Sequence, residues 1–189
     1  MVDLELSVVA ERASVCTACR LADSRTQVVF GSGDPAADVM IIGEAPGREE
    51  DRAGLPFVGR SGQLLDRLIA DELGLGRGQC YVANVVKCRP PENRNPLPDE
   101  VEACRGYLSH QLAFVQPRVV VTLGNFAMRA LLDTTAGITS MRGVTYPFNN
   151  ASLIPTFHPA AALRGGASIL ALMRADFGLA RALLDQVRS

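Results

Sequence analysis

The sequence of 189 residues is 48% hydrophobic, which is enough for one sizeable core. It shows neither a charged amino-terminal segment leading into an apolar run nor an apolar run long enough to cross a bilayer, so we expect a cytoplasmic protein without membrane association. The net charge of −1 lacks the basic surplus that nucleic-acid binders usually carry, although all basic residues except Lys87 are arginines, which bind phosphates well.

Hydrophobic spacing in the first half of the chain predicts two helices and two β-rich segments. In chain order they are a helix over 4–14, β-rich segments at 28–30 and 39–44, and a helix from Ser61, its expected cap, to about residue 73. No composition shift divides the sequence, so residues 1–189 are predicted to form a single domain.

The second half predicts three strands and two long helices. In chain order they are a strand over 80–88, a helix opened by Pro98, a strand over 118–124, a strand over 152–160 and an amphipathic helix over 168–186. Asn125 is expected to cap a short helix after the third strand of the sheet.

Strands that alternate with helices predict an α/β fold, with a central, mainly parallel, four-stranded sheet flanked by helices on both faces. The carboxyl ends of parallel strands meet at one edge, where ligands bind in such sheets. We therefore expect residues 44–57, the Pro-rich segment 89–96 and His158 to line a common crevice. The stretch GEAPG lacks the GxGxxG spacing of a Rossmann site, so no nucleotide cofactor is expected.

Five cysteines stand at positions 16, 19, 80, 88 and 104, and without a secretory signal disulfides are the weaker explanation. Cys16 and Cys19 form a CxxC pair, which alone is also typical of redox sites. With Cys88 and Cys104 they supply four thiolates, which suit a four-iron cluster or a zinc ion. Cys104 equally fits the apolar stripe of its helix, and Cys80 at a strand start is expected to be an ordinary buried cysteine.

Three segments, with these cysteines, resemble the family-4 iron-sulfur uracil-DNA glycosylases: GEAPGREEDRAGLPFVGRSGQLLDRLI, NVVKCRPPENRNPLPDE and FHPAAALR. The likeness runs from Cys16 to about Arg164. It implies a uracil-DNA glycosylase domain that acts as a monofunctional hydrolase on single- or double-stranded uracil-containing DNA, as a monomer. The enzyme flips the uracil out and cleaves its N-glycosidic bond, leaving an abasic site. The resemblance also implies a structural 4Fe-4S cluster rather than zinc, held by Cys16, Cys19, Cys88 and Cys104.

The same resemblance implies roles for three residues around the base. Phe57 would stack on the uracil, although a loop Phe can also simply plug a core. Asn84 would read the base, because an amide can accept from uracil N3-H and donate to O4, and cytosine presents the opposite pattern. His158 would donate to uracil O2 as negative charge develops there. His110, the other histidine, falls in the middle of a helix and is expected to be structural or exposed.

The acidic stretch after the first strand divides into different expected roles. Glu44 would orient the attacking water or stabilise the cationic sugar, and Glu50 resembles the residue that excludes the C5 methyl of thymine. Glu49 and Asp51 are expected to be solvated. Ala45 departs from the best-known branch of the superfamily, where an aspartate holds the water, so no side chain at position 45 holds the water directly in this sequence.

Residues for DNA binding are expected in two loops. Leu163 would fill the gap left by the flipped base and Arg164 would bind a phosphate. The remaining candidates are three basic residues and one that helps shape the pocket, namely Lys87, Arg89, Arg94 and Asn93.

Two other kinds of function fit part of the sequence. A non-catalytic or covalent binder of uracil-containing DNA is one, since a relative in the superfamily captures the abasic sugar through a loop histidine. The segment after Cys88, RPPENRNPLPDEVEA, contains no histidine, which favours turnover. A redox or cluster-carrier protein is the other, but it leaves Phe57, Asn84 and His158 without a role.

Overall fold

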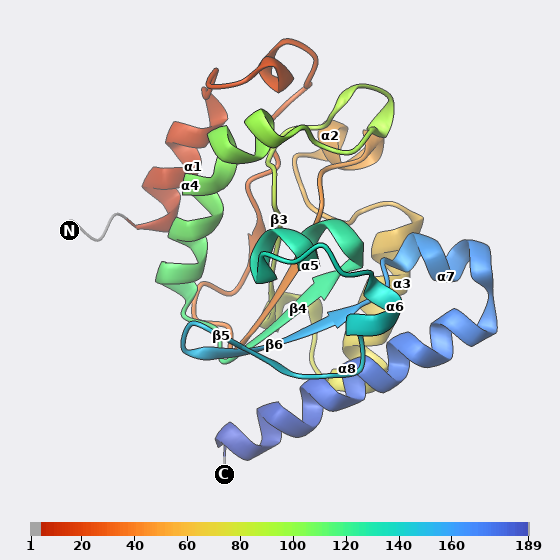
Figure 1. The fold of residues 1–189 in the computed structure, drawn as a ribbon. Helices are drawn as coiled ribbons and strands as arrows, with labels where there is room; N and C mark the ends of the chain where they lie inside the picture. Colours follow the sequence, from red (N-terminus) through yellow and green to blue (C-terminus); the bar gives the residue numbers. More distant parts are fainter. Residues whose placement is uncertain (1–4, 189) are drawn as a thin grey trace.

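The computed structural model describes residues 5–188, which build a sheet of six strands in the order β1-β3-β2-β4-β6-β5 (Figure 1). The strands are β1 (Ser32–Gly33), β2 (Val39–Gly43), β3 (Tyr81–Asn84), β4 (Val119–Leu123), β5 (Tyr146–Phe148) and β6 (Ala151–Thr156). The central strands β3, β2, β4 and β6 run parallel, and the edge strands β1 and β5 run antiparallel to their neighbours. The predicted parallel four-stranded sheet is confirmed, and two short edge strands are added to it.

Helices cover both faces of this sheet, with α1 beside α4 on one face and α8 across the other (Figure 1). The helices are α1 (Leu6–Ser14), α2 (Arg48–Ala53), α3 (Arg60–Leu68), α4 (Pro98–Val115), α5 (Gly124–Leu132), α6 (Ile138–Met141), α7 (Pro159–Gly165) and α8 (Ala167–Arg188). A π-helical turn, Ile69–Leu73, continues α3 to the end predicted from the sequence. No helix among residues 5–188 is long and apolar enough to span a membrane.

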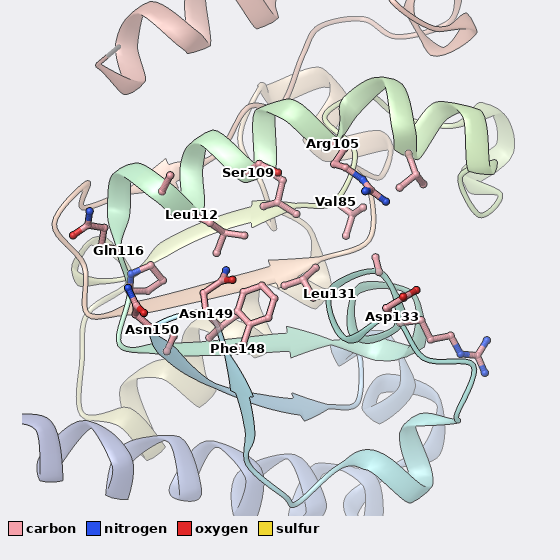
Figure 2. Close-up of a pocket in the computed structure, with 18 residues that line it drawn as sticks. Val85, Arg105, Ser109, Leu112, Gln116, Leu131, Asp133, Phe148, Asn149 and Asn150 are labelled. Carbon is pink, nitrogen blue, oxygen red and sulfur yellow. The ribbon is translucent and has the colours of Figure 1, made fainter. Parts of the chain in front are cut away.

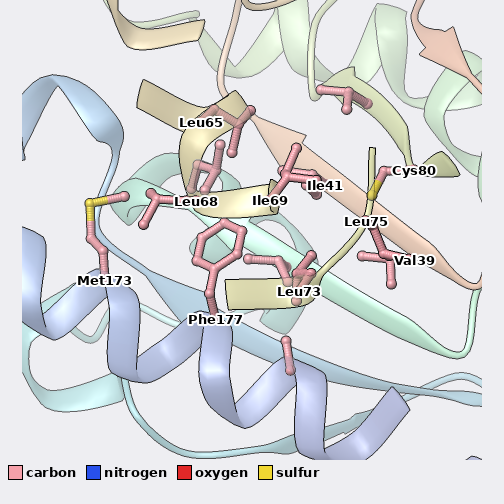
Figure 3. Close-up of a cluster of buried hydrophobic side chains, with 14 of the residues drawn as sticks. Val39, Ile41, Leu65, Leu68, Ile69, Leu73, Leu75, Cys80, Met173 and Phe177 are labelled. Carbon is pink, nitrogen blue, oxygen red and sulfur yellow. The ribbon is translucent and has the colours of Figure 1, made fainter. Parts of the chain in front are cut away.

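Alternate residues of the central strands feed two hydrophobic cores. On β2, Val39 and Ile41 face α3 and α8, where Leu65, Leu68 and Phe177 pack against them (Figure 3). Their neighbours Met40 and Ile42 face the opposite core, beneath α1, α4 and α5. Every residue of β2 is buried, as expected of a strand covered on both faces. Each large apolar side chain buried in this way stabilises the folded state by about 1.5–3 kcal/mol. This packing holds the ends of the strands in fixed positions.

Three local predictions were wrong. Residues 28–30 form no strand, although Val29 N donates to the Lys87 carbonyl at 2.8 Å, and pairing begins instead at Ser32. Ser61 lies inside α3, because Gly59 takes the cap position. Asn125 lies in the first turn of α5, where its Oδ1 accepts from Ile138 N at 2.7 Å and ties α5 to α6. The predicted first helix is α1, and residue 4 lies outside the described residues.

Candidate active site

The predicted crevice lies at the carboxyl ends of the central strands. Backbone pairing continues beyond β2 and β3, because Val85 N donates to the Gly43 carbonyl at 2.9 Å and Val86 N donates to the Glu44 carbonyl at 3.1 Å. Glu44 and Asn84 are therefore held on neighbouring segments by main-chain hydrogen bonds. This arrangement makes their relative position a property of the sheet rather than of a flexible loop.

Gly43 brings Phe57 and Asn84 together, a role that was not predicted from the sequence. A Cβ atom at Gly43 would lie 2.5 Å from Asn84 Oδ1 and 2.5 Å from Phe57 Cζ, closer than atoms can approach. Phe57 is buried with a positive φ of 55°, and the carbonyl of Phe57 packs against Gly62 so closely that a Cβ there would lie 1.8 Å away. A glycine as the last residue of a buried strand was the sequence signal for this close approach.

Asn84 carries a buried acceptor with no partner. Its side chain is 1% exposed, and within residues 5–188 its Oδ1 accepts no hydrogen bond. Leaving such an atom unpaired costs about 1–3 kcal/mol, so it persists where a bound molecule satisfies it. The amide at the end of β3 is therefore suited to a ligand with an N–H group.

His158 stands between β6 and α7, and its ring is 5.8 Å from that of Phe57, centroid to centroid. Its Nδ1 accepts from Ala160 N at 3.1 Å, so the proton of the neutral ring sits on Nε2. Burial lowers the pKa of His158 to about 4, and Arg164 acts in the same direction while Glu50 opposes it. The residue is therefore a neutral imidazole near pH 7, and its Nε2–H is the donor that it can offer to a bound molecule.

A cleft of about 970 Å³ opens beside these residues. Glu44, His158 and Arg164 line it, together with the start of α5 and the Pro-rich segment around Asn95. Burial raises the pKa of Glu44 above its ordinary value. His158 connects the cleft with the buried Phe57, because it lines the cleft and its ring packs on the ring of Phe57.

The acidic residues of α2 hold loops in place. Glu50 Oε1 accepts from Val58 N at 3.0 Å and from Gly59 N at 3.1 Å, which fixes the loop that carries Phe57. Asp51 was expected to be solvated, and that prediction was wrong: it is 3% exposed and accepts from Thr26 N at 2.9 and 3.1 Å. The neighbouring carboxylate of Glu49 is half exposed, as predicted.

Two arginines of the Pro-rich segment are engaged with other side chains of the protein. Arg89 Nε donates to Asn93 Oδ1 at 2.8 Å, and the described lining of the cleft includes Asn95 but not Asn93. Arg94 forms a two-point ion pair with the buried Glu100, at 2.6 and 2.8 Å. The structure therefore does not bring Asn93 to the crevice and commits Arg94 to an internal partner.

Lys87 was grouped with the arginines as a DNA contact, and that prediction was wrong. It is 1% exposed, and burial lowers its pKa to about 7. In contrast, Leu163 on α7 is 41% exposed, and Arg164 beside it lines the cleft. Both remain available to a molecule bound across this edge of the sheet.

Four of the five cysteines surround one small cavity. Cys16 and Cys19 come from the segment after α1, Cys88 follows β3, and Cys104 lies on α4. Burial raises the pKa of Cys88 to about 11 and also raises that of Cys104. Cys80 is buried in the other core, as expected of an ordinary core cysteine.

Two hydrogen-bond donors already face this cavity. Arg25 Nη1 lies 3.5 Å from Cys88 Sγ, and Lys87 N lies 3.3 Å from Cys104 Sγ. The cavity measures about 20 Å³, room for roughly one water, and within residues 5–188 no three metal-binding side chains are close enough to share an ion. The donor set nevertheless fits a thiolate-bound centre, because four sulfurs from three segments converge and charged or amide donors accompany them.

A second hollow of about 910 Å³ lies between α4, the end of α5 and the turn from β5 to β6 (Figure 2). Phe148, Asn149 and Leu112 point into it, and Arg105 stands at its side. It shares Arg105 with the cleft beside His158, so the two hollows adjoin. None of the residues predicted for the site lines this second hollow within the described part of the chain.

Residues 30–177 match the family model described as the uracil DNA glycosylase superfamily, so the chain belongs to that superfamily. A type-4 uracil-DNA glycosylase of Thermotoga maritima is 44% identical over 161 residues, 84% of this chain and 83% of the relative. One from Sulfurisphaera tokodaii is 42% identical over 166 residues, 84% of this chain and 76% of the relative. A type-5 enzyme of Thermus thermophilus is 33% identical over 158 residues, 76% of this chain and 66% of the relative. Within the superfamily, the chain is a member of the type-4 family.

Proposed function

We propose that this protein removes uracil from DNA by hydrolysing the bond between the base and the sugar, leaving an abasic site. The observation that carries the proposal is the buried Asn84 Oδ1, which has no hydrogen-bond partner within residues 5–188 and lies close to Phe57, whose ring in turn packs on the neutral imidazole of His158. The names of its type-4 relatives support the same activity.

Base recognition follows from the amide at the end of β3. A uracil flipped out of the stack would donate its N3-H to Asn84 Oδ1 and accept at O4 from the amide nitrogen. Cytosine has an acceptor at N3 and a donor at C4, so it would leave the buried amide unpaired on both sides. The ring of Phe57, fixed by Gly43 and Gly62, would supply the stacking face.

His158 would stabilise the leaving group. As the bond between C1′ and N1 breaks, its electron pair moves into the uracil ring, and negative charge accumulates on O2. A neutral Nε2–H donor, oriented through the Nδ1 hydrogen bond to Ala160, would bind that oxygen more strongly as the charge grows. Water then adds to C1′, the proton that it loses is taken up by the uracil anion, and uracil leaves as the neutral base.

The carboxylates around the pocket would act at two other points. Glu44, which lines the cleft and has a raised pKa, would orient the water or face the cationic sugar. The methyl of Ala45 cannot bind water, so its contribution is confined to its backbone and the shape of the pocket. Glu50 is held against Val58 and Gly59, so it would form a fixed wall against the C5 methyl of thymine.

The DNA strand would lie across the cleft beside His158. Arg164 would bind a phosphate, and the exposed Leu163 would enter the space vacated by the flipped nucleotide. Arg89 would be a further phosphate ligand, whereas Arg94, through Glu100, would hold the Pro-rich segment in position. We propose that a monomer acts in this way in the cytoplasm, on uracil in single- or double-stranded DNA.

Cys16, Cys19, Cys88 and Cys104 would hold a 4Fe-4S cluster. Such a cluster is proposed here as a structural centre that ties α1, the end of β3 and α4 together, with no part in the hydrolysis. A zinc ion is the competing occupant, and metal analysis of the purified protein distinguishes the two.

The activity is tested with oligonucleotides that carry a single uracil, cytosine or thymine, treated with alkali after incubation to cut abasic sites. The expected result is repeated turnover on uracil alone, with large losses in His158→Ala and Asn84→Ala. Stable protein–DNA adducts would instead assign a covalent binder. A folded, iron-loaded protein that releases no uracil would sink the proposal and favour a binding or cluster-carrier role.

A further inference from the structure

The chain's only lysine lies in a buried polar group that the proposed chemistry does not use. Lys87 is 1% exposed, Gln111 on α4 is fully buried, and Tyr81 at the start of β3 is 4% exposed. Burying a lysine is costly unless its donors are satisfied. Its position in the core therefore calls for a specific set of partners.

Those partners tie Lys87 to the residue proposed to read the base. Lys87 Nζ donates to the main-chain carbonyl of Asn84 at 2.7 Å and to Gln111 Oε1 at 2.5 Å. Gln111 Nε2 in turn donates to the Phe30 carbonyl at 2.8 Å and to Tyr81 Oη at 3.1 Å. The ammonium group also lies 5.9 Å from the centroid of the Phe30 ring.

The backbone of Lys87 meets the cysteine cavity. Its amide donates to Cys104 Sγ at 3.3 Å, and the next residue is Cys88, whose sulfur lines the same cavity. The chain from Asn84 to Cys88 therefore forms a short bridge from the base pocket to the cysteines. Lys87 is held at both ends of this bridge, because its backbone amide contacts Cys104 and its side chain donates to the Asn84 carbonyl.

We propose that Lys87 is a positioning residue for Asn84. Its hydrogen bond to the main-chain carbonyl of Asn84 sets the direction in which the side-chain amide of Asn84 points in the base pocket. The inference rests on the proposed function, because Asn84 must read uracil for its direction to matter. It gives the buried lysine a role in substrate recognition without any contact to the substrate.

Removing the side-chain amine of Lys87 would take away the donor to two buried acceptors, the Asn84 carbonyl and Gln111 Oε1. The peptide group between Asn84 and Val85, still held on its N–H side by the hydrogen bond from Val85 N to the Gly43 carbonyl, would then tilt toward other donors, and the Asn84 side chain would shift with it. Contacts made through the DNA backbone would not change, because Leu163 and Arg164 lie on α7, apart from this hydrogen-bond chain. Loss of base recognition with retained DNA binding is the signature of the role.

The test compares Lys87→Met with Leu108→Ala, which truncates a core residue of α4 on the same sheet face. Three quantities are measured: affinity for free uracil, affinity for DNA containing a stable abasic-site analogue, and iron content. For Lys87→Met we expect about tenfold weaker uracil binding, as the misplaced amide loses one of its hydrogen bonds, with abasic-DNA affinity and iron unchanged. In Leu108→Ala, uracil affinity should stay within about twofold of wild type. Equal losses in both variants, or wild-type uracil affinity in Lys87→Met, would overturn the inference.

A second pair of variants covers the case in which Lys87→Met does not fold. Gln111→Glu keeps an acceptor for Lys87, whereas Gln111→Leu removes it, and both lose the donors to Phe30 and Tyr81. Uracil affinity should fall in the Leu variant and be retained in the Glu variant, and the reverse order would contradict the inference. If the wild-type protein itself binds no uracil, the proposed function fails. If the wild type binds uracil and every variant binds it equally well, only the inference on Lys87 fails.

Discussion

Replacing Gly43 with alanine would place a methyl group between the two residues proposed to hold uracil. Its Cβ would lie 2.5 Å from Asn84 Oδ1 and 2.5 Å from Phe57 Cζ, where ordinary contact begins at 3.4 Å. One of the two side chains must therefore move by about 1 Å, a displacement that can cost on the order of 100-fold in rate when it misplaces a substrate. Overpacking a buried site also lowers the free energy of unfolding by about 1–3 kcal/mol.

The assay is single-turnover excision of uracil from an oligonucleotide, with urea unfolding measured in parallel. Gly106→Ala on α4 is the matched control, because a Cβ there would meet no atom within 4 Å. That control should keep full activity and gain about 0.5–1 kcal/mol of stability, as alanine favours a helix over glycine. A folded Gly43→Ala protein with activity within about twofold of wild type would refute the placement of the base between Phe57 and Asn84.

Three further predictions concern protonation, stability and metal. In an NMR titration of the two histidines, assigned with His110→Gln, His158 should stay neutral until about pH 4. The unfolded chain takes up that proton first, so His158 lowers stability as pH falls from about 6.5 to 4, and a midpoint near 6.5 would contradict its burial. Glu100→Gln should cost about 2 kcal/mol in urea unfolding, because the neutral amide keeps one acceptor for Arg94 but loses the two-point, charge-assisted pair; a loss below about 0.5 kcal/mol would show the pair to be unimportant. Cys16→Ser should lower both the iron content and the unfolding temperature, and unchanged iron would remove Cys16 from the ligand set.

Much of the fold was predictable because apolar runs bounded by Gly and Pro mark buried parallel strands. The runs ending at Gly43 and near Asn84, and the helix opened by Pro98, follow this pattern directly. The edge strands β1 and β5 were missed because they are two and three residues long, below the length at which alternation can be recognised. The Asn125 cap failed because a tertiary partner, Ile138 N, takes its side-chain oxygen.

The position of site residues was predictable where they lie at strand ends. It was not predictable where burial depends on tertiary hydrogen-bond partners. Glu44, Asn84 and His158 gather at one edge because parallel strands end there. The burial of Asp51 and Lys87 depends on hydrogen bonds with Thr26 and with Gln111, both more than twenty residues away, which no local pattern encodes. From the sequence alone, a charged residue is expected to be solvated, and only the folded structure shows a hydrogen-bond partner distant in the sequence.

The most direct test of the proposed base site is a crystal structure of the wild-type protein with free uracil. In that structure, uracil N3 should lie within hydrogen-bonding distance of Asn84 Oδ1, its ring should stack on Phe57, and O2 should face His158 Nε2. Uracil bound elsewhere on the protein, or with its N3 turned away from Asn84, would contradict the proposed base site.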